Sequence, residues 1–98
     1  MIAVANKRVN SDGQYIGRPS PLGNPFVIGP DGTRDEVIAL YKHWLTEIWN
    51  NGGINAQLTE LHRLGDLARA GDLTLVCWCA PQACHGDIIK RFIKEYLL

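Results

Sequence analysis

The sequence lacks an excess of charge of either sign, because its ten basic and ten acidic side chains cancel. It also lacks any run of the roughly 18 to 20 apolar residues that span a membrane. Its N-terminus lacks the charged and apolar regions of a signal peptide. We therefore expect a cytoplasmic protein with neither a membrane nor a nucleic-acid partner, while a homo-oligomer stays open.

Cysteine is scarce, and its three copies all lie between residues 77 and 84. Secreted disulfide scaffolds have dispersed, paired cysteines, so this clustering favours reduced thiols. Internal repeats and low-complexity tracts are missing as well. A chain of 98 residues, 46% of them hydrophobic, can bury one modest core. We expect a single domain over residues 1–98.

Short apolar runs predict the strands. Residues 2–5 and 73–79 have the length and the β-branched or apolar character of buried strands. Residues 15–16 and 26–28 are long enough only for short extended pieces. If the two longer strands are parallel, their polar ends emerge at the same edge of a sheet.

Helical spacing of apolar residues predicts three helices, over 34–50, over 56–70 and from about 84–87 to the end of the chain. Thr33 and Glu36 form a capping-box pattern in front of the first helix. Strands and helices together predict an α/β fold, a small, mostly parallel sheet flanked by helices. Its strand connections are Rossmann-like, but the sheet is smaller than a complete Rossmann fold.

Residues 9–32 form a connection rich in glycine and proline. A loop this long in a compact domain tends to be functional or disordered. We interpret it as a stiff loop that presents Arg18, Ser20 and Asn24. The alternative is a packed connection with a solvated arginine.

A second group of reactive side chains follows the strand at 73–79. Cys79, Cys84, His85 and Gly86 lie where this strand passes into the last helix, and ligands of open α/β sheets bind beyond the carboxyl ends of strands. The first turn of a helix also offers N–H groups without partners. These groups favour a thiolate, so we expect a lowered pKa for Cys84.

Two functions fit this junction directly. The first is anion binding, in which the backbone of residues 84–86 and the guanidinium of Arg18 hold the phosphate of a nucleotide or nucleotide-like molecule. The second is chemical conversion of that ligand, with Cys84, His85 or Asp87 as nucleophile, acid or base. Whether the protein is an enzyme stays open, and no cofactor is expected.

A zinc-stabilised interaction module without catalysis is the alternative. Cys77, Cys79, Cys84 and His85 supply the ligand types of a zinc site, but their spacing departs from the usual zinc knuckle. A disulfide between Cys79 and Cys84 is also conceivable.

The proposed ligand contacts come from the polar end of the first strand, from the loop and from the junction. The expected binding residues are Asn6, Lys7, Arg8, Tyr15, Arg18, Ser20, Asn24, Cys79 and Gly86.

Two stretches resemble a family of small domains of unknown function found in bacteria and their phages. They are YIGRPSPLGNPFVIGPDGTRDEVIALY at 15–41 and LTLVCWCAPQACHGDII at 73–89, and an N-terminal VANKR is also similar. The resemblance implies membership of that family and no particular activity. The motif positions that it implies are Arg18, Asn24, Cys79, Cys84 and His85.

Overall fold

The computed structural model describes residues 1–8, 12–79 and 82–98 of the chain. Within these ranges, three strands form a parallel sheet in the order β1-β3-β2. The strands are β1 (Ile2–Asn6), β2 (Gln14–Tyr15) and β3 (Leu73–Cys77). Asn6 lies opposite Cys77, so the polar end of β1 and the cysteine end of β3 emerge at the same edge. The predicted parallel arrangement is confirmed.

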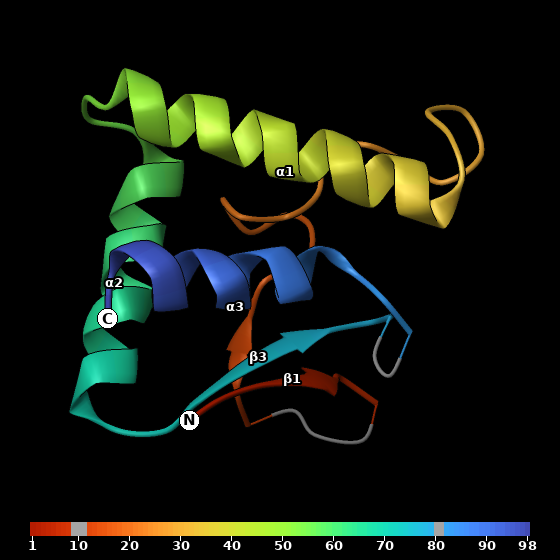
Figure 1. Cartoon of the computed structure of the whole chain (residues 1–98). Helices are drawn as coiled ribbons and strands as arrows, with labels where there is room; N and C mark the ends of the chain where they lie inside the picture. Colours follow the sequence, from red (N-terminus) through yellow and green to blue (C-terminus); the bar gives the residue numbers. More distant parts are fainter. Residues whose placement is uncertain (9–11, 80–81) are drawn as a thin grey trace.

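The helices of the described part are α1 (Arg34–Asn51), α2 (Ala56–Ala70) and α3 (His85–Tyr96), close to the predicted ranges. α3 lies along the sheet, and α1 runs on the side of α3 that faces away from the sheet (Figure 1). α2 contacts both other helices and β3. These elements confirm the predicted α/β fold of a small domain.

One hydrophobic core joins the sheet to the helices. Leu73, Leu75 and Cys77 face it from β3, because alternate residues of a strand point to the same side. The helices contribute side chains at helical spacing, which places them on one face of each helix. The fully buried helical residues of this core are Tyr41, Leu45, Leu61, Leu64, Ile89 and Ile93.

The predictions for two extended segments, 73–79 and 26–28, are wrong in part. β3 ends at Cys77 rather than at residue 79. The Lys7 N–H donates to the carbonyl of Cys77 at 2.8 Å, and the next carbonyl, that of Trp78, is bonded by the Asn6 side chain instead of a strand backbone. Residues 26–28 form no strand. The amides of Phe26 and Val27 bond to side-chain oxygens of Asn24 and Asp31 instead of a neighbouring strand.

Gly65 permits a close contact between α2 and the end of the chain. A Cβ atom at this buried position would lie 3.0 Å from Cδ1 of Leu97. Beside it, the guanidinium of Arg69 donates to the carbonyl of Leu97 at 2.6 Å. The C-terminal end of α3 is thereby held against α2.

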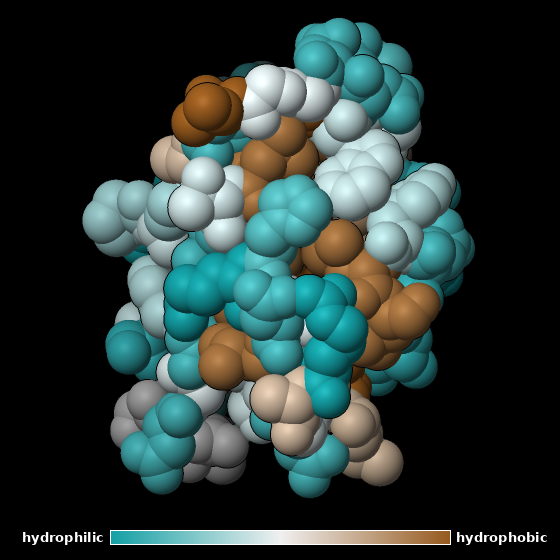
Figure 2. Space-filling model, turned by 90° about the vertical axis from the view of Figure 1, so that its left-hand side faces the viewer, coloured by the Kyte–Doolittle hydropathy of each residue, from teal (hydrophilic) through white to brown (hydrophobic). Residues whose placement is uncertain are grey.

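The face on the α2 side carries hydrophilic residues interrupted by hydrophobic ones (Figure 2). None of the described helices combines the length and the apolar character that crossing a bilayer requires.

Candidate functional site

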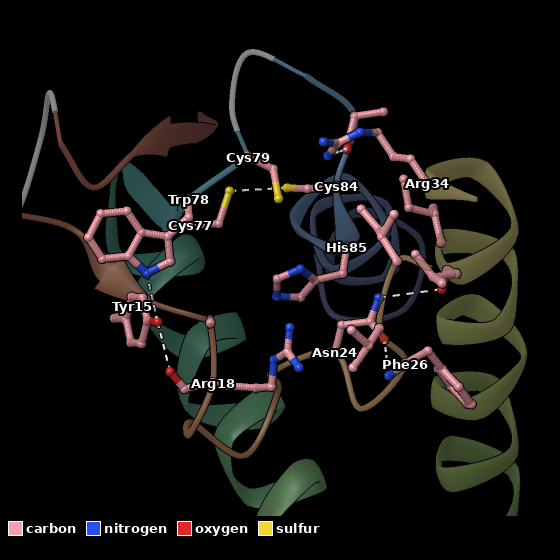
Figure 3. Close-up of a pocket in the computed structure, with 16 residues that line it drawn as sticks. Tyr15, Arg18, Asn24, Phe26, Arg34, Cys77, Trp78, Cys79, Cys84 and His85 are labelled. Carbon is pink, nitrogen blue, oxygen red and sulfur yellow. Dashed lines mark hydrogen bonds between the residues drawn. The ribbon is translucent and has the colours of Figure 1, made fainter. Parts of the chain in front are cut away.

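A pocket of about 390 Å³ opens at the carboxyl edge of the sheet (Figure 3). Its lining comes from three segments that are distant in sequence: 15–28, 34–38 and 77–85. Pockets that bind small molecules have volumes of about 300 to 1,000 Å³. The pocket lies where parallel sheets bind ligands, between the loop after β2 and the junction of β3 with α3.

A short hydrogen-bond chain holds the first part of the loop. Trp78 Nε1 donates to the Tyr15 hydroxyl at 3.1 Å, and that hydroxyl donates to the carbonyl of Arg18 at 2.8 Å. Gly17 allows this contact, because a Cβ atom there would lie 2.5 Å from the Tyr15 oxygen. The side chain of Arg18 is left exposed at the pocket.

The second part of the loop is tied to α1. The Asn24 side chain accepts the Phe26 N–H at 2.9 Å and donates to the carbonyl of Val37 at 3.4 Å. The buried Tyr41 hydroxyl donates to the carbonyl of Leu22 at 2.8 Å, and burial raises the pKa of Tyr41. Asn24 lines the pocket while its amide group braces the loop.

Two arginines line the pocket. Arg18 comes from the loop, and Arg34 is the first residue of α1. Arg34 Nη1 donates to the carbonyl of Ala83 at 3.1 Å, which joins α1 to the segment before α3. In the view of Figure 3 the two guanidinium groups lie on opposite sides of His85. Two cations at one pocket favour an anionic ligand.

His85 is a buried polar residue, only 7% exposed. Its Nε2 lies 2.7 Å from the carbonyl oxygen of Ile16. Because a carbonyl only accepts, Nε2 carries the proton and Nδ1 keeps its lone pair. Burial lowers the pKa of His85, and the charge of Arg18 lowers it further, while the bond to Ile16 and the charge of Asp87 oppose the shift. The imidazole is therefore neutral at pH 7.

Cys84 precedes α3 as its N-cap, and its sulfur lies 3.1 Å from that of Cys77. The Gly86 N–H donates to the same sulfur at 3.3 Å. The contact with Cys77 and burial raise the pKa of the Cys84 thiol, and they outweigh the opposing Gly86 bond. The expected lowering of this pKa is wrong, because the helix terminus cannot offset the loss of solvent and the neighbouring thiol.

The predicted phosphate cradle at the start of α3 is already occupied by side chains of the same helix. The Gly86 N–H bonds to the Cys84 sulfur, and the Cys84 N–H donates to the Asp87 carboxylate at 3.2 Å. The Cys84 side chain also accepts the backbone N–H of Asp87, and these reciprocal bonds of Cys84 and Asp87 form a capping box. Gly86 and Asp87 do not line the pocket, so they lie outside the site that Arg18, Cys84 and His85 share.

Four other predicted binding residues also lie outside the pocket lining, namely Asn6, Lys7, Arg8 and Ser20. The Asn6 side chain donates to the carbonyl of Trp78 and accepts the N–H of Arg8, which joins the ends of β1 and β3. Lys7 Nζ lies 5.1 Å from the centre of the Tyr15 ring. The Ser20 hydroxyl is buried and finds no hydrogen-bond partner in the described part of the chain.

The structure brings together about half of the residues predicted for the site and adds others. Arg34 and Cys77 were absent from the predicted binding and catalytic set but line the pocket. The position of Arg34 directly after the capping residue Thr33 was a usable signal, since a helix start often faces a ligand. The predicted residues that line the pocket are Tyr15, Arg18, Asn24, Cys79, Cys84 and His85.

Metal ligands do not gather within residues 1–8, 12–79 and 82–98, where no three His, Cys, Asp or Glu side chains form a group that could hold an ion. All three cysteines are free thiols. Residues 80 and 81 of the predicted junction lie outside the described residues.

The family model described as Domain of unknown function (DUF4326) matches residues 3–95. The chain therefore belongs to this family, which confirms the predicted membership of a family of small domains of unknown function. No curated protein and no solved structure matches the chain.

Proposed function

We propose that this chain, a member of the DUF4326 family, binds a small anionic ligand in the pocket, specifically a nucleotide or a nucleotide derivative. The observation that carries the proposal is the placement of Arg18 and Arg34 on one pocket whose remaining wall is largely apolar and aromatic. Guanidinium groups bind phosphate oxygens through paired hydrogen bonds, while an apolar wall suits the rest of the ligand.

The aromatic side of the pocket favours a ligand with a flat ring. Trp78 is 53% exposed, lines the pocket and is oriented by its bond to Tyr15. Base stacking on an aromatic side chain is worth about 1 to 3 kcal/mol per base. A nucleotide combines such a ring with the negative charge that the arginines require.

Binding is better supported than nucleophilic catalysis. The raised pKa of Cys84 leaves its sulfur protonated at neutral pH, and a thiol is a far weaker nucleophile than a thiolate. His85 is the pocket residue suited to proton transfer, because its neutral ring keeps one unprotonated nitrogen. Chemical conversion of the ligand would therefore proceed through His85 as a base.

The test is a thermal-melting screen with nucleoside mono-, di- and triphosphates and dinucleotides. A ligand at 100 times its Kd stabilises the folded state by about 2.7 kcal/mol. We expect Arg18→Ala to lose this stabilisation while its melting temperature without ligand stays near that of the parent, because the side chain is exposed. Arg91→Ala is the matched control, since Arg91 is also exposed and does not line the pocket.

The screen contradicts the proposal if Arg18→Ala responds like the parent protein, or if no nucleotide raises the melting temperature. Chromatography of the ligand after incubation separates a binder from an enzyme, because only an enzyme consumes it. Stoichiometric zinc in protein purified without chelator, lost in Cys84→Ser, would instead favour the zinc module. The cytoplasmic location and the bacterial or phage origin stay predictions from the sequence.

A further inference from the structure

The wall of the pocket contains a close pair of thiols that nucleotide binding does not use. The sulfurs of Cys77 and Cys84 lie 3.1 Å apart, and both residues line the pocket. The sulfurs of a disulfide lie about 2.05 Å apart, so a closure of about 1 Å separates this pair from a covalent bond. Cys77 ends β3 and Cys84 caps α3, and both side chains belong to the core.

We infer that Cys77 and Cys84 are a modification site, at which a peroxide converts the two thiols into a reversible intramolecular disulfide. Cys77 and Cys84 are only 1% and 3% exposed, and both line the pocket, so the pocket is the route by which a small oxidant would reach their sulfurs. This step concerns the free protein and does not depend on the identity of the ligand.

The reaction is balanced with hydrogen peroxide as the oxidant. One thiol first loses its proton, because the thiolate is the nucleophile. Its sulfur attacks a peroxide oxygen, the O–O bond breaks and the departing hydroxide takes up that proton, which yields a sulfenic acid and one water molecule. The second sulfur then attacks the sulfenic sulfur, the S–O bond breaks and the hydroxyl leaves as a second water molecule with the remaining thiol proton. The two sulfurs lose two electrons, and the two peroxide oxygens gain them. A thiol reductant reverses the bond by exchange.

Cys79 is the natural competitor, because it is half-buried and lines the same pocket. It follows the end of β3, where the chain no longer keeps the strand geometry that orients Cys77. The sulfur that approaches Cys84 within hydrogen-bonding distance is that of Cys77. We therefore expect Cys79 to stay a thiol, which makes it an internal control.

The experiment treats the full chain with hydrogen peroxide, alkylates the remaining thiols and measures the intact mass. We expect a loss of two hydrogen atoms and alkylation of one cysteine. All three cysteines lie between Arg69 and Lys90 with no other lysine or arginine between them, so trypsin leaves them on one peptide. Chymotryptic cleavage after Trp78 separates Cys77 from the other two, and only a disulfide from Cys77 keeps the fragments joined.

Three alanine variants identify the partner. Cys79→Ala is expected to form the disulfide to the same extent as the parent, while Cys77→Ala and Cys84→Ala lose it. A bond to Cys79, a bond between two chains, or alkylation of all three cysteines after peroxide would overturn the inference. If Cys77→Ala or Cys84→Ala fails to fold, the chymotryptic fragments of the parent and of Cys79→Ala still decide which cysteines are bonded.

Discussion

The two ends of the core are built from different chemistry. Where the three helices meet, the buried side chains are apolar, as at Leu45 and Leu61. At the carboxyl ends of the strands, the buried positions carry Cys77, Cys84 and His85. The helical end is stabilised mainly by burial of apolar surface. The pocket end needs a hydrogen-bond partner for each polar group, because an unpaired buried group is costly.

Because of this difference, the residues that mainly stabilise the fold and the residues that shape the proposed binding site lie at different ends of the core. The buried side chains of the helical end that the comparison uses are apolar, so substitutions there can be judged by volume and packing. At the pocket end, the bonds of His85 to Ile16 and of Arg34 to Ala83 connect segments that are distant in sequence. These bonds fix the shape of the pocket. Substitutions at the two ends should therefore change different measured quantities.

The largest effect is expected from Leu61→Ala at the helical end. Leu61 is fully buried in α2, and removing a buried leucine side chain costs about 2 to 5 kcal/mol. Leu67→Ala in the same helix is the matched control, because Leu67 is 37% exposed and should cost less. Urea denaturation measures both. Equal losses in the free energy of unfolding at the two positions would contradict the role of burial. A loss of nucleotide affinity in the folded Leu61 variant would contradict the separation of the two ends.

The next effect is a pH dependence of stability that comes from His85. Its pKa in the folded protein lies below the ordinary value of 6.5, mainly through burial. As the pH falls from 6.5 toward the lowered value, the unfolded chain binds a proton that the native state does not bind. The free energy of unfolding therefore decreases with falling pH across this window and levels off below it.

His85→Gln removes this titration and should flatten that part of the pH profile. The control is His43→Gln, because His43 is exposed on α1 and pairs with Glu47 away from the pocket. Urea denaturation at a series of pH values gives the slopes. A parent-like slope in the His85 variant, or a flattened slope in the His43 variant, would assign the acid sensitivity to another group.

The smallest effect is expected from Ser20→Ala. The Ser20 hydroxyl is buried without a partner among the described residues, so its removal should stabilise the fold by about 1 kcal/mol. Thr59→Ala serves as the control, because Thr59 is exposed on α2. A clear destabilisation would contradict the expected gain by showing that the hydroxyl stabilises the fold. The loss of nucleotide-induced stabilisation would show that Ser20 contacts the ligand, as the sequence predicted.

Several features were predictable from local sequence. The three helices followed from apolar spacing and from the capping pattern of Thr33 and Glu36, whose bonds both form. The parallel pairing of β1 with β3 followed from two short apolar runs with polar ends. The end of β3 was not predictable in this way, because it depends on the hydrogen bonds that Asn6 and Lys7 make there.

The predicted site was correct in its place and incomplete in its members. Arg18 meets Cys84 and His85 at one pocket, as expected. The sequence could not show that the first amides of α3 bond to Cys84 and Asp87, since these bonds depend on side-chain geometry. It could not show the raised pKa of Cys84 either, because that shift depends on burial and on the distance to Cys77.

By itself, the sequence determined the helices, the parallel strands and the junction at which reactive side chains gather, because periodicity and capping act over a few residues. Only the tertiary structure placed Arg34 beside Ala83, set the sulfur of Cys77 against that of Cys84, and chose the proton-bearing nitrogen of His85. The last two features depend on burial, and all three depend on contacts across the fold, which a local pattern does not encode.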